Sequence, residues 1–112
     1  MTEDEALTYA ERTVIRQHFL SREVGTSSIH TGFPLRRWAG GPNEGQPRLT
    51  NAIQSMLDRG LIVIVDSDTS LVAKFTNKGI RALKRSAADP RAFEHRFYWK
   101  LHAELAEVAE DL

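Results

Sequence analysis

The sequence predicts an α+β domain that is mainly helical, with one small antiparallel hairpin and a long C-terminal helix. Apolar side chains recur at helical spacing in three separate segments. A β-branched run, a polar turn and an alternating run follow one another between residues 61 and 75, which is the pattern of a hairpin. The length of 112 residues suits one domain, which we place at residues 1–88, with the last helix at 89–112.

The composition excludes several classes of protein. Hydrophobic residues make up 41% and charged residues 27%, which argues against a disordered chain. Fifteen Lys and Arg residues balance fifteen Asp and Glu residues, so the chain is not uniformly basic. It has no cysteine and therefore no disulfide, thiolate metal site or cysteine nucleophile. We expect a cytoplasmic protein with no membrane partner, because the N-terminus lacks a signal-peptide core and the longest apolar run, Leu61–Val65, is too short to cross a bilayer.

The first helix is expected from about Asp4 to Arg22, where apolar residues recur every three or four positions. Thr2 and Glu5 have the spacing of a capping box, and Gly25 is a suitable residue to end the helix.

The next segment contains most of the glycine and proline. Thr26–Phe33 is expected to form a short extended segment, and Leu35–Ala39 a single helical turn anchored by Trp38. The sequence AGGPNEGQP that follows predicts a loop.

A second helix is predicted over residues 48–59, with Pro47 at its first position and Gly60 at its end. Its apolar positions follow the spacing of one helix face: Leu49, Ala52, Ile53, Met56 and Leu57.

A hairpin follows directly. Leu61–Val65 and Leu71–Phe75 are the predicted strands, and Asp66–Ser70 is the polar turn between them. Thr76 is expected to cap the next helix.

The last helix is predicted to run from Pro90 for about 20 residues. It carries an apolar stripe at steps of three and four: Phe93, Phe97, Leu101, Leu105 and Val108. Its first half is basic and its second half acidic, so two copies packed antiparallel would pair opposite charges. We therefore expect this stripe to be the interface of a homodimer; in the alternative, the helix folds back onto its own domain.

Residues 48–85 resemble a known family. The segments LTNAIQSMLDRGLIVIV and LVAKFTNKGIRALKR are similar to the recognition helix, wing and following helix of winged helix-turn-helix domains in MarR-like and PadR-like bacterial regulators. In such a domain Gly60 would let the helix turn into the wing, and Gly79 would permit close packing. The chain departs from the pattern in the Gly- and Pro-rich residues 35–46, where a helix should precede the recognition helix, and in the acidic wing tip DSDTS.

The resemblance implies a small DNA-binding transcriptional regulator that reads duplex DNA with the helix at 48–59. Arg, Asn and Gln are the side chains that contact base edges, and Arg and Lys contact phosphates. The residues expected at DNA are Arg48, Thr50, Asn51, Gln54, Ser55, Arg59, Arg36, Arg37 and Lys74. Alternatively, Arg36 and Arg37 form a solvated rim around a core Trp38, and the domain is a protein–protein interaction module that does not bind DNA.

Nothing in the sequence predicts an enzyme or a cofactor. It contains no GxSxG motif, no phosphate-binding loop and no convincing pair of carboxylates. The four histidines are scattered and have no carboxylate or cysteine at metal-ligand spacing, so no metal site is expected.

Overall fold

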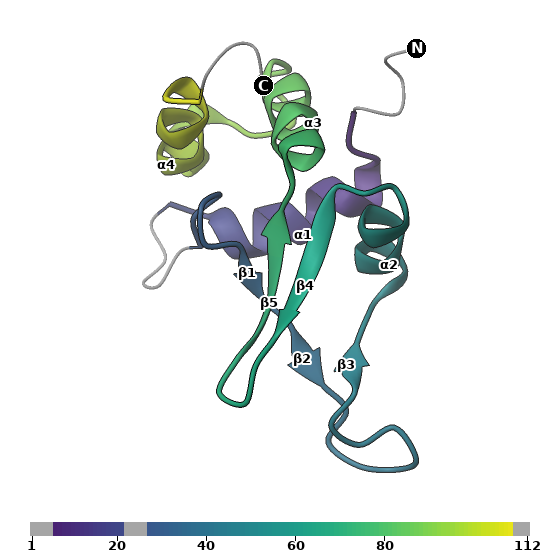
Figure 1. Ribbon diagram of the computed structural model, residues 1–112. Helices are drawn as coiled ribbons and strands as arrows, with labels where there is room; N and C mark the ends of the chain where they lie inside the picture. The colour runs from purple at the N-terminus through teal and green to yellow at the C-terminus, as the bar shows by residue number, and fades with distance from the viewer. Residues whose placement is uncertain (1–5, 22–26, 109–112) are drawn as a thin grey trace.

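The computed structural model describes residues 6–21 and 27–108. In this part the chain forms four helices and two small antiparallel sheets, which confirms the predicted α+β class. The elements in chain order are α1 (Tyr9–Phe19), β1 (Phe33–Pro34), β2 (Arg36–Arg37), β3 (Pro47–Arg48), α2 (Asn51–Asp58), β4 (Ile62–Asp66), β5 (Leu71–Phe75), α3 (Asn77–Ala87) and α4 (His95–Ala106) (Figure 1).

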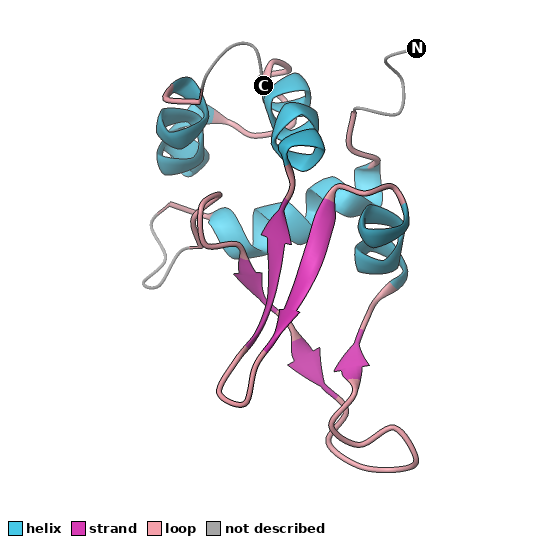
Figure 2. Ribbon diagram, in the orientation of Figure 1, coloured by secondary structure: helices cyan, strands magenta, loops and turns pink. Residues whose placement is uncertain are grey.

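The predicted hairpin is the centre of the larger sheet. Strands β4 and β5 pair antiparallel, and the short strand β1 adds to β5, so the strand order is β1-β5-β4. The second strand has the predicted bounds. The first begins and ends one residue later than expected, so Asp66 belongs to the strand and not to the turn. The β4–β5 and β2–β3 hairpins both extend away from α3 and α4, toward the same end of the molecule (Figure 2).

Helix α1 is shorter at both ends than the predicted helix. Its N-cap is Thr8, whose side chain accepts a hydrogen bond from the Glu11 backbone, while the Glu11 carboxylate accepts one from the Thr8 backbone. This capping box starts the helix at Tyr9 and not at Asp4. The proposed cap at Thr2 and Glu5 and the proposed stop at Gly25 lie outside the described residues.

The prediction of a helical turn over Leu35–Ala39 is wrong. Arg36 and Arg37 form strand β2, which pairs with Pro47 and Arg48 of β3. The loop between these strands closes through positive φ angles at two of its glycines, 81° and 85°, a conformation that glycine adopts without strain. The Gly- and Pro-rich segment is therefore a hairpin loop, and Pro47 belongs to a strand and not to a helix.

Two predicted helix boundaries are confirmed. Gly60, which follows α2, has a φ of 75° in the left-handed region, as expected of a glycine that ends a helix. At the start of α3, the Thr76 hydroxyl accepts a hydrogen bond from the Gly79 backbone N–H. Helix α2 itself begins later than predicted, at Asn51, with the Thr50 side chain as its cap.

Helix α4 is shorter than the predicted helix of about 20 residues. It spans 12 residues and has a kink at Tyr98, where φ is −130° and ψ is 34°. The segment after Pro90 forms turns, because Asp89 accepts the Arg91 backbone N–H through its side chain and the Ala92 N–H through its carbonyl. The remaining predicted positions, 109–112, are outside the described part. No helix in residues 6–21 and 27–108 is long and apolar enough to cross a membrane.

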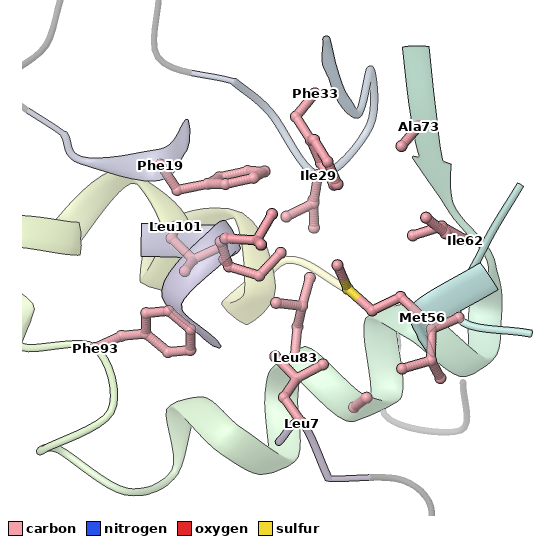
Figure 3. Packing of buried hydrophobic residues seen from close by; sticks show 14 of the residues in the cluster. Leu7, Phe19, Ile29, Phe33, Met56, Ile62, Ala73, Leu83, Phe93 and Leu101 are labelled. Atoms are coloured by element: carbon pink, nitrogen blue, oxygen red, sulfur yellow. The ribbon is translucent and has the colours of Figure 1, made fainter. Parts of the chain in front are cut away.

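One hydrophobic core joins all the helices to the larger sheet. It includes Phe19 of α1, Met56 of α2, Leu83 of α3 and Leu101 of α4, together with Ala73 of β5 (Figure 3). Their exposed fractions lie between 0 and 1%. The C-terminal helix is therefore part of the same packed body as the hairpin.

The predicted close packing at Gly79 is confirmed, since a Cβ at this position would lie 1.9 Å from the Leu61 carbonyl oxygen. We expect Gly79→Ala to lower the free energy of unfolding by about 1–3 kcal/mol, because α3 must move away from the β4 entry to admit the methyl group. Gly40→Ala is the control, as a Cβ there meets nothing within 4 Å. Urea unfolding measures both, and equal effects would contradict the packing argument.

Candidate nucleic-acid interface

The exposed face of α2 presents two of the predicted base-reading side chains. Asn51 and Gln54 are both exposed, and Thr50 is exposed at the helix start. The Gln54 side-chain amide donates to the Asp58 carboxylate over 2.9 Å. This is a surface contact within one helix, so it leaves the Gln54 amide accessible from solvent.

Two other residues of the predicted DNA set face the protein. Ser55 donates to the buried carboxylate of Glu11 over 2.7 Å, and the Arg59 guanidinium forms an ion pair with the same carboxylate. Arg59 also donates to the Ala6 carbonyl over 2.7 Å. Their assignment as DNA contacts is not supported by this geometry, because these side chains hold α2 against the start of α1.

Two arginines lie opposite each other on the β2–β3 hairpin, just before α2. Arg36 and Arg48 are Cα partners in the strand pair, and both are exposed. The Arg48 guanidinium carbon lies 4.9 Å from the centre of the Trp38 ring, which is 40% exposed. The reading of Trp38 as a core residue is therefore wrong, because the hairpin places its ring on the surface under an arginine.

Arg37 is turned toward the β4–β5 hairpin. Its guanidinium donates to the Asp66 carboxylate over 2.6 Å and to the Ser67 carbonyl over 3.1 Å. Hydrogen bonding from Arg37, together with its charge, lowers the pKa of Asp66. The expected phosphate contact of Arg37 is thus replaced by a tie between the two hairpins, which also neutralises one of the two acids at the tip.

A hollow of about 470 Å³ lies beside the two exposed arginines. It is lined by Val14, Gln17, His18, Pro34, Leu35, Arg36, Arg48, Thr50 and Ile53. Burial lowers the pKa of His18, whose ring stacks on Phe33 with centroids 4.9 Å apart. The imidazole is therefore uncharged at neutral pH, and Arg36 and Arg48 supply the positive charge at this hollow.

Lys74, the last of the predicted DNA residues, is exposed on β5. It pairs with Val63 of β4, which is 49% exposed. The lysine therefore extends from the outer face of the hairpin, away from the hollow's lining.

The predicted dimer stripe is covered by its own domain. Phe93, Leu101 and Leu105 are buried in the core, while Phe97 and Val108 are partly buried against it. The structure agrees with the alternative, in which the helix folds back onto its own domain, because α4 is short and kinked and packs on α1 and α3. The homodimer itself stays a prediction.

Sequence reasoning missed the buried carboxylate of Glu11, which fixes the position of α2. The signal was present in the sequence, since Thr8 and Glu11 have the spacing of a capping box. The β2–β3 hairpin was also missed, because strands of two residues each are too short to show a periodic pattern in the sequence.

Comparisons of the chain with protein-family models, with curated proteins and with solved structures found no match.

Proposed function

We propose that the chain is a winged helix-turn-helix DNA-binding domain, a small transcriptional regulator that places α2 in the major groove of duplex DNA. The order of its elements supports this: a helix, a short strand, the amphipathic helix α2, the β4–β5 hairpin and a further helix. The β2–β3 hairpin occupies the place in the chain where a helix precedes the recognition helix in that family.

The pair Arg36 and Arg48 carries the proposal. Like charges directly opposite each other in an antiparallel pair repel, and neither arginine forms an ion pair within residues 6–21 and 27–108. A phosphate backbone would relieve the repulsion by pairing with both. The exposed residues Asn51 and Gln54 follow on the adjoining helix, and side chains of these two types can bind adenine through its major-groove edge.

The proposed interface is thus smaller than the predicted one. It consists of Arg36, Arg48, Thr50, Asn51 and Gln54, with Lys74 on the outer face of the β4–β5 hairpin. Ser55, Arg59 and Arg37 are left out because they bind carboxylates of the protein itself.

A salt titration tests the phosphate contacts. For wild type we expect log K for a generic duplex to fall steeply with log[salt], and for Arg36→Ala with Arg48→Ala the slope should decrease by about two. Both side chains are exposed, so thermal unfolding should change little. Lys78→Gln with Lys100→Gln removes the same charge elsewhere and should leave the slope nearly unchanged. A wild-type protein that binds no duplex at low salt would refute the proposal.

Gln54→Ala tests the base contact separately. On a duplex selected for tight binding it should cost about 1–3 kcal/mol of discrimination against other sequences, because a bidentate contact to a base edge is lost. The salt slope should stay as in wild type, since no phosphate contact changes. Equal losses on selected and random duplexes would contradict base reading by this residue.

The alternative, a protein-interaction module, is favoured by a different observation. Val63 and Val65 are 49% and 43% exposed on β4, the strand at the edge of the sheet. An exposed edge with β-branched side chains can accept a strand from a partner. The same titration separates the two functions, because only the DNA-binding function predicts a salt-dependent complex with duplex.

A further inference from the structure

A second hollow, of about 280 Å³, lies where α1 meets the turn between α3 and α4. It is lined by Tyr9, Arg12, Arg16, Asp89, Arg91 and Ala92. The two contributing segments are more than 70 residues apart in sequence, and the hydrogen bond from Arg16 Nε to the Ala92 carbonyl, 2.9 Å long, joins them.

The charge in this hollow is positive. Three guanidinium groups meet a single carboxylate, that of Asp89. Asp89 accepts the Arg91 backbone N–H over 3.0 Å, and its carboxylate lies 3.5 Å from Arg91 Nε. The backbone hydrogen bond and the charges of Arg91 and Arg12 lower the pKa of this carboxyl. It is therefore ionised at neutral pH, and the group of four side chains carries two net positive charges.

Arg12 and Arg16 each donate one side-chain hydrogen bond to the part of the chain that the structure describes. Arg12 uses Nη1 for the Leu7 carbonyl, and Arg16 uses Nε for Ala92. Among the described residues, Arg12 Nε is buried with no hydrogen-bond partner, and neither arginine forms an ion pair. A buried N–H without a partner is rare in folded proteins and points to a group that residues 6–21 and 27–108 do not supply.

Tyr9 adds an exposed aromatic ring to the same place. Its ring is 72% exposed, and the guanidinium carbons of Arg12 and Arg16 each lie 5.9 Å from its centre. The two arginines are four residues apart on one helix, so they lie on the same face. The ring therefore stands at the rim of the positive hollow, where it offers a surface on which a flat group can stack.

We propose that this hollow is a binding site for a small phosphate-bearing molecule, held by Arg12, Arg16 and Arg91. The planar guanidinium fork matches the oxygens of a phosphate and can donate two parallel hydrogen bonds. The phosphate can come from inorganic phosphate or from a nucleoside monophosphate whose base stacks on Tyr9. The site shares no residue with the α2 surface, so it does not depend on DNA binding.

The test is a titration of the full chain in which backbone amide NMR shifts are the readout. The separate probes are inorganic phosphate, adenosine monophosphate and adenosine, at matched ionic strength. We expect inorganic phosphate to shift the amides of residues 9–16 and 89–92 with saturation, and adenosine to shift none of them. Tighter binding of the monophosphate than of inorganic phosphate would assign the nucleotide as the source, and equal binding the free anion.

Variants decide whether the arginines hold the anion. Arg12→Gln with Arg16→Gln should weaken phosphate binding at least tenfold, while Lys78→Gln with Lys100→Gln should not change it. Arg91→Gln guards against a folding defect in the double variant, because its side chain is 91% exposed; it should weaken binding several-fold without a change in Tm. The proposal would be overturned if the affinity for phosphate were unchanged in Arg91→Gln and in Arg12→Gln with Arg16→Gln. It would also be overturned if chloride shifted the same amides equally, or if duplex DNA were the only ligand that displaced phosphate.

Discussion

Replacing Glu11 by Ala should be strongly destabilising, by about 3–5 kcal/mol, because it breaks the ion pair between this buried carboxylate and Arg59 and removes the acceptor for Ser55. The Glu11 side chain is fully buried and accepts hydrogen bonds from the Thr8 backbone, the Ser55 hydroxyl and the Arg59 guanidinium. These contacts connect α1 to α2, so the variant also loosens the helix proposed to read DNA. Urea unfolding measures the cost, and Glu44→Ala, at an exposed loop position, is the control. A cost no larger than that of the control would contradict the network.

The same carboxylate gives a pH dependence of known sign. Burial alone would raise the pKa of Glu11, but hydrogen bonds from Thr8, Ser55 and Arg59 and the charge of Arg59 outweigh it and lower the pKa below its ordinary value of 4.5. A carboxyl with a lowered pKa in the folded state stabilises the protein above its unfolded-state pKa. This contribution should decline as the pH falls below about 4.5 and through the lower folded-state pKa. Glu11→Gln should lack that part of the pH dependence, as unfolding midpoints measured from pH 7 downward would reveal.

Replacing Leu101 by Ala should also have a large effect, about 2–5 kcal/mol, because the side chain is 1% exposed in the core between α1 and α4. Trp99, two residues earlier on the same helix, is 55% exposed. Trp99→Ala should therefore change the unfolding free energy much less. Chemical denaturation of both variants measures the difference.

The Leu101 variant also separates the two readings of the C-terminal helix. If α4 belongs to the core of its own domain, the loss of stability in Leu101→Ala is independent of protein concentration. If the stripe is a dimer interface, the loss grows on dilution and sedimentation shows a shift toward monomer. We expect the first result, and the second would restore the stripe as an intersubunit contact.

Elements whose signals are local could be predicted from the sequence. The apolar spacing of α2, the alternating strand β5 and the cap at Thr76 each depend on residues within one or two turns of the chain. Gly60 could be assigned for the same reason, since a helix that ends in the left-handed region favours a residue without a Cβ. These features give the α+β class and the exposed face with Asn51 and Gln54.

Which polar side chains of that face are exposed could be seen only in the folded chain. Ser55 and Arg59 have the same chemistry as their exposed neighbours, but a buried carboxylate more than 40 residues earlier in the chain binds both. Likewise, the apolar stripe of the last helix indicates that Leu101 is buried but does not indicate which segment covers it. In the folded chain, α1 and α3 of the same domain cover it. Periodicity depends on neighbours along the chain, whereas pairing and burial depend on contacts between segments that only the folded chain brings together.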